Sequence, residues 1–169
     1  SPGKIHPRLL AAGVVGSLIP DADVFGFELG IPYDHLFGHR GISHSLLFAV
    51  LFSLSTTLVF FRNARWAMIR GRIVVFLFLI TASHGLFDAM TNGGLGVAFF
   101  APIDDTRYFL PFRPIQVSPI GPSALINPGL VSILFGEIIW IWFPCVAIAA
   151  ATYLALRWME RRRSVPGAA

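Results

Sequence analysis

A long apolar stretch spans residues 130–156 and reads LVSILFGEIIWIWFPCVAIAAATYLAL, with Glu137 as its single charged residue. About 20 apolar residues suffice for a helix to cross a bilayer, so this stretch predicts a transmembrane helix. The whole chain of 169 residues is 55% hydrophobic and 13% charged, with a mean hydropathy of +0.70. A soluble domain carries about 25% charged residues and cannot bury so much apolar surface at this size. The composition excludes an ordinary cytosolic enzyme, a disordered chain and a disulfide scaffold, and it predicts an integral membrane protein.

Three more apolar segments precede this stretch, at residues 9–20, 46–61 and 73–90. The first is too short to span alone, which predicts a half-membrane helix, whereas the second nearly spans when residues 43–45 are added. Spanning segments should be helical, because unpaired backbone groups are costly in hydrocarbon. We predict an all-α membrane helix bundle forming a single domain over residues 1–169. Its site-bearing helices cover residues 9–91, an outer loop rich in Pro, Gly and aromatics covers 92–129, the last span 130–157 and a basic tail 158–169.

Basic residues gather beside the apolar segments, at Lys4 and Arg8, at Arg62, Arg65, Arg70 and Arg72, and at Arg161, Arg162 and Arg163. Cytoplasmic loops carry an excess of Lys and Arg. This bias predicts a cytoplasmic N-terminus, a cytoplasmic loop 62–72 and a cytoplasmic C-terminus, with residues 21–44 and 91–129 outside. The basic residues behind the net charge of +4 therefore indicate how the chain is oriented in the membrane, and they do not indicate nucleic-acid binding. The single cysteine, Cys145, excludes an intrachain disulfide and indicates nothing about the redox compartment.

Six ligand-type side chains should meet at the outer membrane level: Asp21, Asp23, His39, His44, His84 and Asp88. His84 and Asp88 are four residues apart, so a helix places them on one face. Ionisable residues within a membrane helix are expensive and mark functional sites by default. A mixed set of His and Asp suits a divalent metal, zinc above all, with manganese and iron also open. Six donors exceed the needs of one tetrahedral ion, so the number of ions, one or two, stays open.

Taken singly, each of these residues also has a structural interpretation. His84 and Asp88 can form a hydrogen bond that locks helix packing, and the histidines before the second span can be solvated. Ser43 is the predicted N-cap of that span, with His44 in its first turn. Asp21 and Asp23 can form a turn or a helix cap. The convergence of three segments at one level is what favours the metal site.

Neighbouring polar residues leave further alternatives open. The guanidinium of Arg40 can bind a phosphate or carboxylate through two N–H groups. Alternatively, Arg40 lies at the level of the lipid head groups and helps to set the membrane topology. Asp34 and His35 can orient the metal ligands from behind. Arg107 and Arg113 either meet an anionic head group or belong to a lid that packs over the bundle. Glu137 is either a structural hydrogen-bonding group or a ligand from the last span.

Four motifs resemble the YdjM-type family of membrane-bound metal-dependent hydrolases: LIPDAD at residues 18–23, GHRGISHS at 38–45, SHGLFD at 83–88 and LPFRPI at 110–115. The resemblance covers residues 9–121 and implies a bacterial or archaeal inner-membrane protein. A more distant likeness to zinc-dependent phospholipase C proteins, which also use an H-x-x-x-D helix, favours phosphoester hydrolysis. The family's N-terminal motif with a His is not matched by His6. Either residues precede Ser1 or this member lacks one ligand, so the resemblance leaves the number of ions open.

These observations lead to one functional expectation and one alternative. We expect a metal-dependent hydrolase acting on a phosphoester-containing lipid at the outer membrane face, with Arg40 steadying the anionic group. A carboxylate that is not a ligand, Asp23 among them, would serve as base. The alternative is a non-catalytic metal-binding membrane protein, such as a transport component or sensor. The apolar inner halves of the spans at 46–61 and 130–156 argue against a transport pathway.

Overall fold

The computed structural model describes residues 6–120 and 128–163. The chain forms two compact units, Ser1–Arg113 and Pro114–Ala169. All regular elements among the described residues are helical, which confirms the all-α prediction. A single domain over residues 1–169 stays a prediction. Lys4, part of the predicted outer loop and the end of the basic tail lie outside the described residues.

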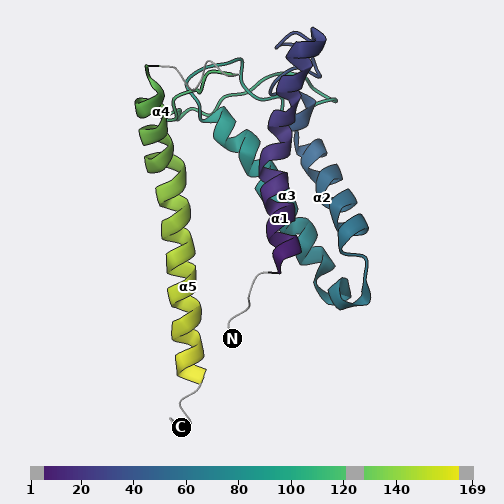
Figure 1. Cartoon of the computed structure of the whole chain (residues 1–169), viewed down its shortest axis with the longest axis vertical. Helices are drawn as coiled ribbons and strands as arrows, with labels where there is room; N and C mark the ends of the chain where they lie inside the picture. Colours follow the sequence, from purple (N-terminus) through teal and green to yellow (C-terminus); the bar gives the residue numbers. More distant parts are fainter. Residues whose placement is uncertain (1–5, 121–127, 164–169) are drawn as a thin grey trace. The chain divides into compact units, whose positions relative to one another are not determined.

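The first unit is a bundle of three helices that lie side by side, α1 (Pro7–Leu18), α2 (Leu46–Phe60) and α3 (Arg70–Ala89) (Figure 1). Shorter 3-10 helices join them: η1 (Ile19–Leu29), η2 (Ile42–His44) and η3 (Ala64–Ile69). The helices meet through small buried residues, Gly13 and Gly16 on α1 and Ala49, Ser53 and Thr57 on α2. Small residues let membrane helices approach closely. Many large apolar side chains of all three helices stay exposed, as expected for a surface that faces lipid.

The first apolar segment is longer than the sequence predicted. η1 continues α1, and together they form a candidate span, Pro7–Leu29, of 23 residues. The prediction of a segment too short to span was wrong because Pro20 does not end the helix. Pro20 lies in the first turn of η1, where its missing N–H would have had no helical partner. Ala64–Ala89 is a second candidate span, whereas α2 is a shorter apolar helix of 15 residues.

The beginning of α2 also differs from the prediction. Its N-cap is Ser45, whose hydroxyl accepts a hydrogen bond from the backbone N–H of Phe48. Ser43 and His44 lie one step earlier, in η2. The prediction of Ser43 as N-cap, with His44 in the first helical turn, was therefore wrong. The extra 3-10 turn frees both side chains for contacts with η1.

In the second unit one helix continues through three segments, α4 (Leu130–Glu137), the π-helical η5 (Ile138–Trp142) and α5 (Phe143–Arg163). Residues Leu130–Arg162 form a candidate span of 33 residues, and this range contains the predicted last span at 130–157. The wider π turn lies directly before Pro144, which cannot donate a backbone hydrogen bond. The π segment thus lets an apolar helix continue past a proline.

Candidate metal centre

Three segments deliver ligand-type side chains to one end of the three-helix bundle. Asp21 and Asp23 lie in η1, directly after α1, and His44 ends η2, directly before α2. His84 and Asp88 lie one turn apart near the end of α3. α1 and α3 run toward this end and α2 runs away from it (Figure 1). This arrangement joins residues that are far apart in the sequence, such as Ser17 and His84, which are 67 positions apart.

Four donor atoms form the first group: His44 Nε2, His84 Nε2, Asp21 Oδ1 and Asp88 Oδ2. Asp88 Oδ2 lies 3.0 Å from His44 Nε2 and 3.6 Å from His84 Nε2. Asp21 Oδ1 lies 3.2 Å from His84 Nε2 and 3.6 Å from His44 Nε2. Donors bound tetrahedrally at 2.0–2.1 Å are separated by about 3.3 Å. The four separations bracket this value, so the group can hold one metal ion.

Each histidine of this group is fixed through its other ring nitrogen. His84 Nδ1 lies 2.8 Å from the backbone oxygen of Ser17, an acceptor, so Nδ1 carries the proton. His44 Nδ1 lies 3.1 Å from Asp23 Oδ2 and 3.0 Å from Ser43 Oγ. With the proton on Nδ1, the lone pair of Nε2 faces the group. Metal-binding histidines are oriented in this way by carboxylates and backbone carbonyls.

Three of the four donor atoms have no hydrogen-bond partner outside the group. Among the described residues, His44 Nε2, His84 Nε2 and Asp88 Oδ2 are buried and face only other donors of the group, with Asp88 Oδ2 at 3.0 Å from His44 Nε2. Buried polar atoms are partnered in the large majority of cases, so each exception needs an explanation. Three such atoms that face one another fit the donor set of a cation.

A proton competes with a metal ion for the same position. Burial lowers the pKa of His44, but the carboxylates of Asp21, Asp23 and Asp88 outweigh it and raise that pKa to about 10. The metal-free group therefore favours a charged imidazole at neutral pH. A divalent cation would satisfy the same carboxylates while displacing that proton.

Access to the first group is from the side of Asp21. The side chain of Asp21 is 51% exposed, whereas that of His44 is fully buried and that of Asp88 is 18% exposed. Three donors are thus held inside and one lies at the solvent boundary. Structural metal sites are closed, whereas catalytic sites keep one position open to water or substrate.

Asp23 and His39 form a second group with His44. Asp23 Oδ1 lies 2.7 Å from His39 Nδ1, and Asp23 Oδ2 accepts hydrogen bonds from Ser43 Oγ at 2.5 Å and from the backbone N–H of Arg40 at 3.1 Å. Both carboxylate oxygens of Asp23 therefore have partners. The sequence placed all six residues around a common point. The structure gathers four of them there and sets Asp23 and His39 behind His44.

Arg40, which lies between η1 and η2, is buried against the end of α3 and the residues that follow it. Its Nη2 donates to Asp88 Oδ1 at 3.0 Å, and its Nη1 donates to Thr91 Oγ1 at 2.9 Å and to the backbone oxygen of Gly93 at 3.1 Å. Its backbone has a φ of +62°, in the region that side chains other than glycine rarely adopt. A guanidinium that is 4% exposed does not fit a head-group-level topology residue. Its contacts hold Asp88, and its predicted contact with an anionic group stays a prediction.

Comparison with known proteins identifies the family. The sequence model of the family described as YdjM inner membrane protein matches residues 1–164. The chain belongs to this family. The protein is 38% identical over 160 residues to the inner membrane protein YbcI of Escherichia coli K12, covering 94% of this chain and 87% of YbcI. It is 33% identical over 102 residues to the protein YvsG of Bacillus subtilis 168, covering 55% of this chain and 58% of YvsG. No solved structure matches significantly.

Membership in the YdjM family, with three candidate membrane spans, confirms the predicted location in the inner membrane. The family name and the names of the relatives mention no activity and no metal. The function of this YdjM-family protein must therefore be argued from the geometry of its site.

Two glycines permit the approach of the YdjM-family segments to one another. A Cβ at Gly85 would lie 3.0 Å from the backbone oxygen of His44, so the absent side chain lets α3 contact η2. A Cβ at Gly41 would lie 2.2 Å from the backbone oxygen of Leu36, which no side chain tolerates. Both glycines thus set the position of His44 relative to α3.

The remaining polar residues named from the sequence do not belong to the two groups of donor atoms. Arg107 donates to the backbone oxygens of His39 at 2.9 Å and Tyr33 at 3.0 Å. These contacts favour the alternative in which the segment carrying Arg107 packs over the bundle, rather than the one in which Arg107 meets a lipid head group. The Arg113 guanidinium lies over the ring of Phe109. Asp34 and His35 are exposed, and His35 Nδ1 accepts a hydrogen bond from the backbone N–H of Phe37. Glu137 lies in the second unit, at the end of α4.

Sequence reasoning missed the groups that orient the ligands. Ser17 contributes a backbone oxygen, which no side-chain pattern reveals. Thr91 was not singled out, although its hydroxyl accepts from Arg40. Ser43 was interpreted as a cap, whereas its hydroxyl contacts Asp23 and His44. The close spacing of Ser43 and His44 was the one available signal.

Proposed function

We propose that this protein is a membrane-bound metal-dependent hydrolase acting on a phosphoester-containing lipid. The observation that carries the proposal is the set of three buried donor atoms, on His44, His84 and Asp88, that face one another beside the half-exposed Asp21 and have no hydrogen-bond partner outside the group. A divalent ion, zinc by preference, supplies a water-derived nucleophile at neutral pH when bound to such a set. The sequence likeness to zinc-dependent phospholipase C proteins supports the phosphoester chemistry.

The residues divide into holding and orienting roles. His44, His84 and Asp88 would hold the ion, with Asp21 as the fourth donor at the open side. Asp23 keeps a proton on Nδ1 of His44, and the backbone carbonyl of Ser17 keeps a proton on Nδ1 of His84. The Nε2 lone pair of each histidine then remains free to bind the ion. Arg40 fixes Asp88 through Oδ1 and leaves Oδ2 directed into the group. Asp23 contacts His39 through Oδ1 and His44 through Oδ2, so His39 is linked to His44 only through Asp23.

Asp21 is the group best placed to exchange a proton with solvent. Its carboxylate is the most exposed of the four, whereas the carboxylate of Asp23 has partners on both oxygens. A general base must reach water and must be free to accept a proton. Asp23 therefore orients His39 and His44 rather than acting as base, and Asp21 is the donor of the group nearest to solvent.

The lipid nature of the substrate rests on where the centre lies. The four donors stand at the end of apolar helices, and Asp21 follows directly on α1 within a candidate span. A phosphoester at the boundary of a bilayer can reach such a site without leaving the membrane. A closed structural site does not require an exposed Asp21.

The test combines metal content with turnover on the same samples. Purified protein in detergent should carry zinc and should hydrolyse at least one member of a panel of phospholipids and lipid phosphates. His84→Ala and Asp88→Asn should each lose both metal and turnover, because each removes a donor. Asp34→Asn is the matched control, since it removes an exposed carboxylate of the neighbouring loop, and it should retain both. A fully metal-loaded wild type that hydrolyses nothing across the panel would favour the non-catalytic metal-binding alternative.

A further inference from the structure

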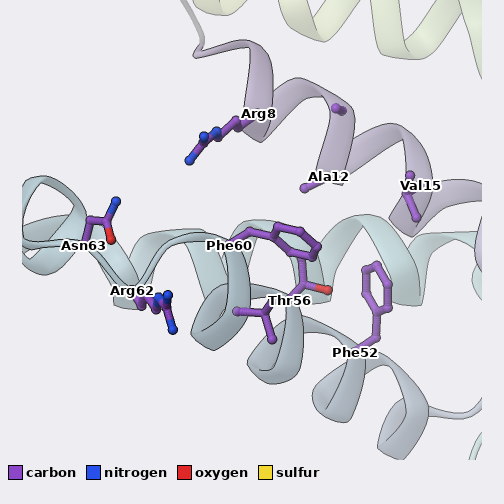
Figure 2. A pocket seen from close by; sticks show the side chains of 10 residues that line it. Arg8, Ala12, Val15, Phe52, Thr56, Phe60, Arg62 and Asn63 are labelled. Carbon is purple, nitrogen blue, oxygen red and sulfur yellow. The ribbon is translucent and has the colours of Figure 1, made fainter.

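A groove lies between α1 and α2 at the end of the bundle opposite the metal centre. It is lined by α1 from Arg8 to Val15, by α2 from Phe52 to Phe60 and by the two residues after Phe61, and its volume is about 670 Å³ (Figure 2). Volumes of this size are typical of small-molecule sites. On α1 the lining of the groove ends at Val15, and none of the candidate metal ligands lines it. The groove is thus separate from the candidate metal centre.

The walls of the groove are apolar along most of its length. α1 contributes small side chains, Ala11, Ala12 and Val15, and α2 contributes Phe52, Val59 and Phe60. α1 packs on α3 through Gly13, whose Cβ position lies 3.2 Å from Ile80, and its alanines are too short to fill the space toward α2. Val15, Val59 and Phe60 are about half exposed, so the groove opens sideways to the surroundings of the helices. In a bilayer these surroundings are acyl chains.

Two arginine side chains lie at one end of the groove. Arg8, in the first turn of α1, and Arg62, directly after α2, both line the groove, and Asn63 lies beside Arg62 (Figure 2). Among the described residues, neither guanidinium has a hydrogen bond or an ion pair. By contrast, the guanidinium of Arg70 donates to the backbone oxygens of Phe61 and Arg62, and that of Arg65 lies over the ring of Trp66. Arg8 and Arg62 are therefore cations that line the groove and remain available to a ligand.

The charge at this end of the bundle is uniformly positive. Residues 1–20 and 35–87 contain no Asp or Glu, so no acidic side chain of α1, α2 or the segment joining α2 to α3 neutralises the arginines. The N-terminus of α1 adds a partial positive charge at the same place. A ligand that complements this groove has an anionic group at one end and a long apolar part.

We propose that the groove binds one anionic phospholipid, with its phosphate between Arg8 and Arg62 and one acyl chain between α1 and α2. A free phosphate would use the arginines but leave the apolar walls empty. A neutral lipid would fill the walls but leave both charges without a counter-ion. The topology predicted from the basic residues places this end in the cytoplasmic leaflet, where anionic lipids attract arginines. The lipid is a bound partner at the end opposite the hydrolytic centre and is not its substrate.

The test measures lipid binding to the purified full chain by native mass spectrometry, with the metal removed by chelator so that the result is independent of hydrolysis. The probes are dioleoyl phosphatidylglycerol and dioleoyl phosphatidylcholine. The wild type should bind one phosphatidylglycerol at least tenfold more tightly than phosphatidylcholine. Each arginine near a membrane surface contributes about fivefold, so Arg8→Gln with Arg62→Gln should reduce the preference to about twofold or less.

Two further variants separate this site from general attraction. Arg65→Gln with Arg72→Gln removes the same charge outside the groove and should keep the preference. Val15→Trp fills the apolar part and should weaken both lipids while keeping the preference for phosphatidylglycerol. Equal losses in the two double variants, or full competition by glycerol 3-phosphate, would overturn the proposal. So would unchanged binding of both lipids by Val15→Trp.

Discussion

Asp88 divides its carboxylate between two tasks. Oδ1 accepts a hydrogen bond from Arg40, and Oδ2 faces His44 Nε2 at 3.0 Å and His84 Nε2 at 3.6 Å. The sequence revealed half of this arrangement, because the spacing of His84 and Asp88 predicts a shared helix face. The contact with Arg40, 48 positions away, depends on the fold and could not be predicted.

Arg40→Ala should destabilise the metal-free protein by about 3 kcal/mol, since it leaves Asp88 with an unpaired charge in a largely buried position. Added zinc should recover part of this loss, because a cation on Oδ2 compensates the same carboxylate. Thermal unfolding in detergent, with and without zinc, measures both effects. Arg72→Ala, which removes an exposed arginine at the other end of α3, is the control and should leave stability within about 0.5 kcal/mol. Equal stabilities of Arg40→Ala and the control would contradict the role of Arg40.

Zinc affinity should rise about tenfold per pH unit between pH 6 and pH 9, because the ion displaces a proton from His44. The metal-free pKa of His44 is raised from 6.5 to about 10, despite burial, by Asp21, Asp23 and Asp88. A proton on His44 therefore stabilises the metal-free fold fully below pH 6.5, and this contribution is lost as the pH rises through about 10. Calorimetric titrations in buffers of different ionisation enthalpy should show release of at least one proton per zinc. A dissociation constant that does not change with pH would exclude His44 as a ligand.

At the scale of elements, the apolar segments were predictable because length and composition alone decide which helices can span. The joints between elements were not. The sequence SHS at 43–45 offers two serines as caps, and only the contacts of η2 with Asp23 decide for Ser45. Likewise, α1 continues through Pro20 into η1, where Asp23 contacts His44 of η2 and Asp21 contacts His84 of α3, and these long-range contacts are not visible in the local sequence.

Gly85→Ala tests the contact between α3 and η2. The new Cβ would lie 3.0 Å from the backbone oxygen of His44, so α3 and η2 must separate. We expect a loss of about 1–3 kcal/mol and a weaker zinc affinity. Gly71→Ala lies on the same helix, where a Cβ meets no atom within 4 Å, and it should be neutral or stabilising by up to about 1 kcal/mol. If both variants behave alike in unfolding and zinc titrations, close approach at Gly85 is not what positions His44.

At the scale of the whole molecule, the two ends of the bundle differ in charge and chemistry. Carboxylates and histidines collect at one end, and arginines with an apolar groove at the other. The sequence already predicted this polarity from the distribution of Lys and Arg. The groove itself could not be predicted, because it results from α1 packing on α3 and leaving space toward α2.

Cysteine labelling tests the orientation predicted from these charges. In a Cys145→Ser background, a membrane-impermeant maleimide added to intact cells should label Asn92→Cys and should not label Asn63→Cys. Both positions are exposed, so accessibility in detergent should be equal and serves as the control. Labelling of Asn63→Cys in intact cells would invert the topology and place the metal centre on the cytoplasmic side.

The central claim is that two imidazoles and carboxylate oxygens hold one divalent ion. X-ray absorption spectroscopy of the zinc-loaded full chain measures this most directly. We predict two imidazole nitrogens at about 2.0–2.1 Å and two oxygens at about 2.0–2.2 Å, with one imidazole lost in His84→Ala. A coordination sphere without imidazole, one with sulfur at about 2.3 Å, or one unchanged in His84→Ala would contradict the assignment of the centre.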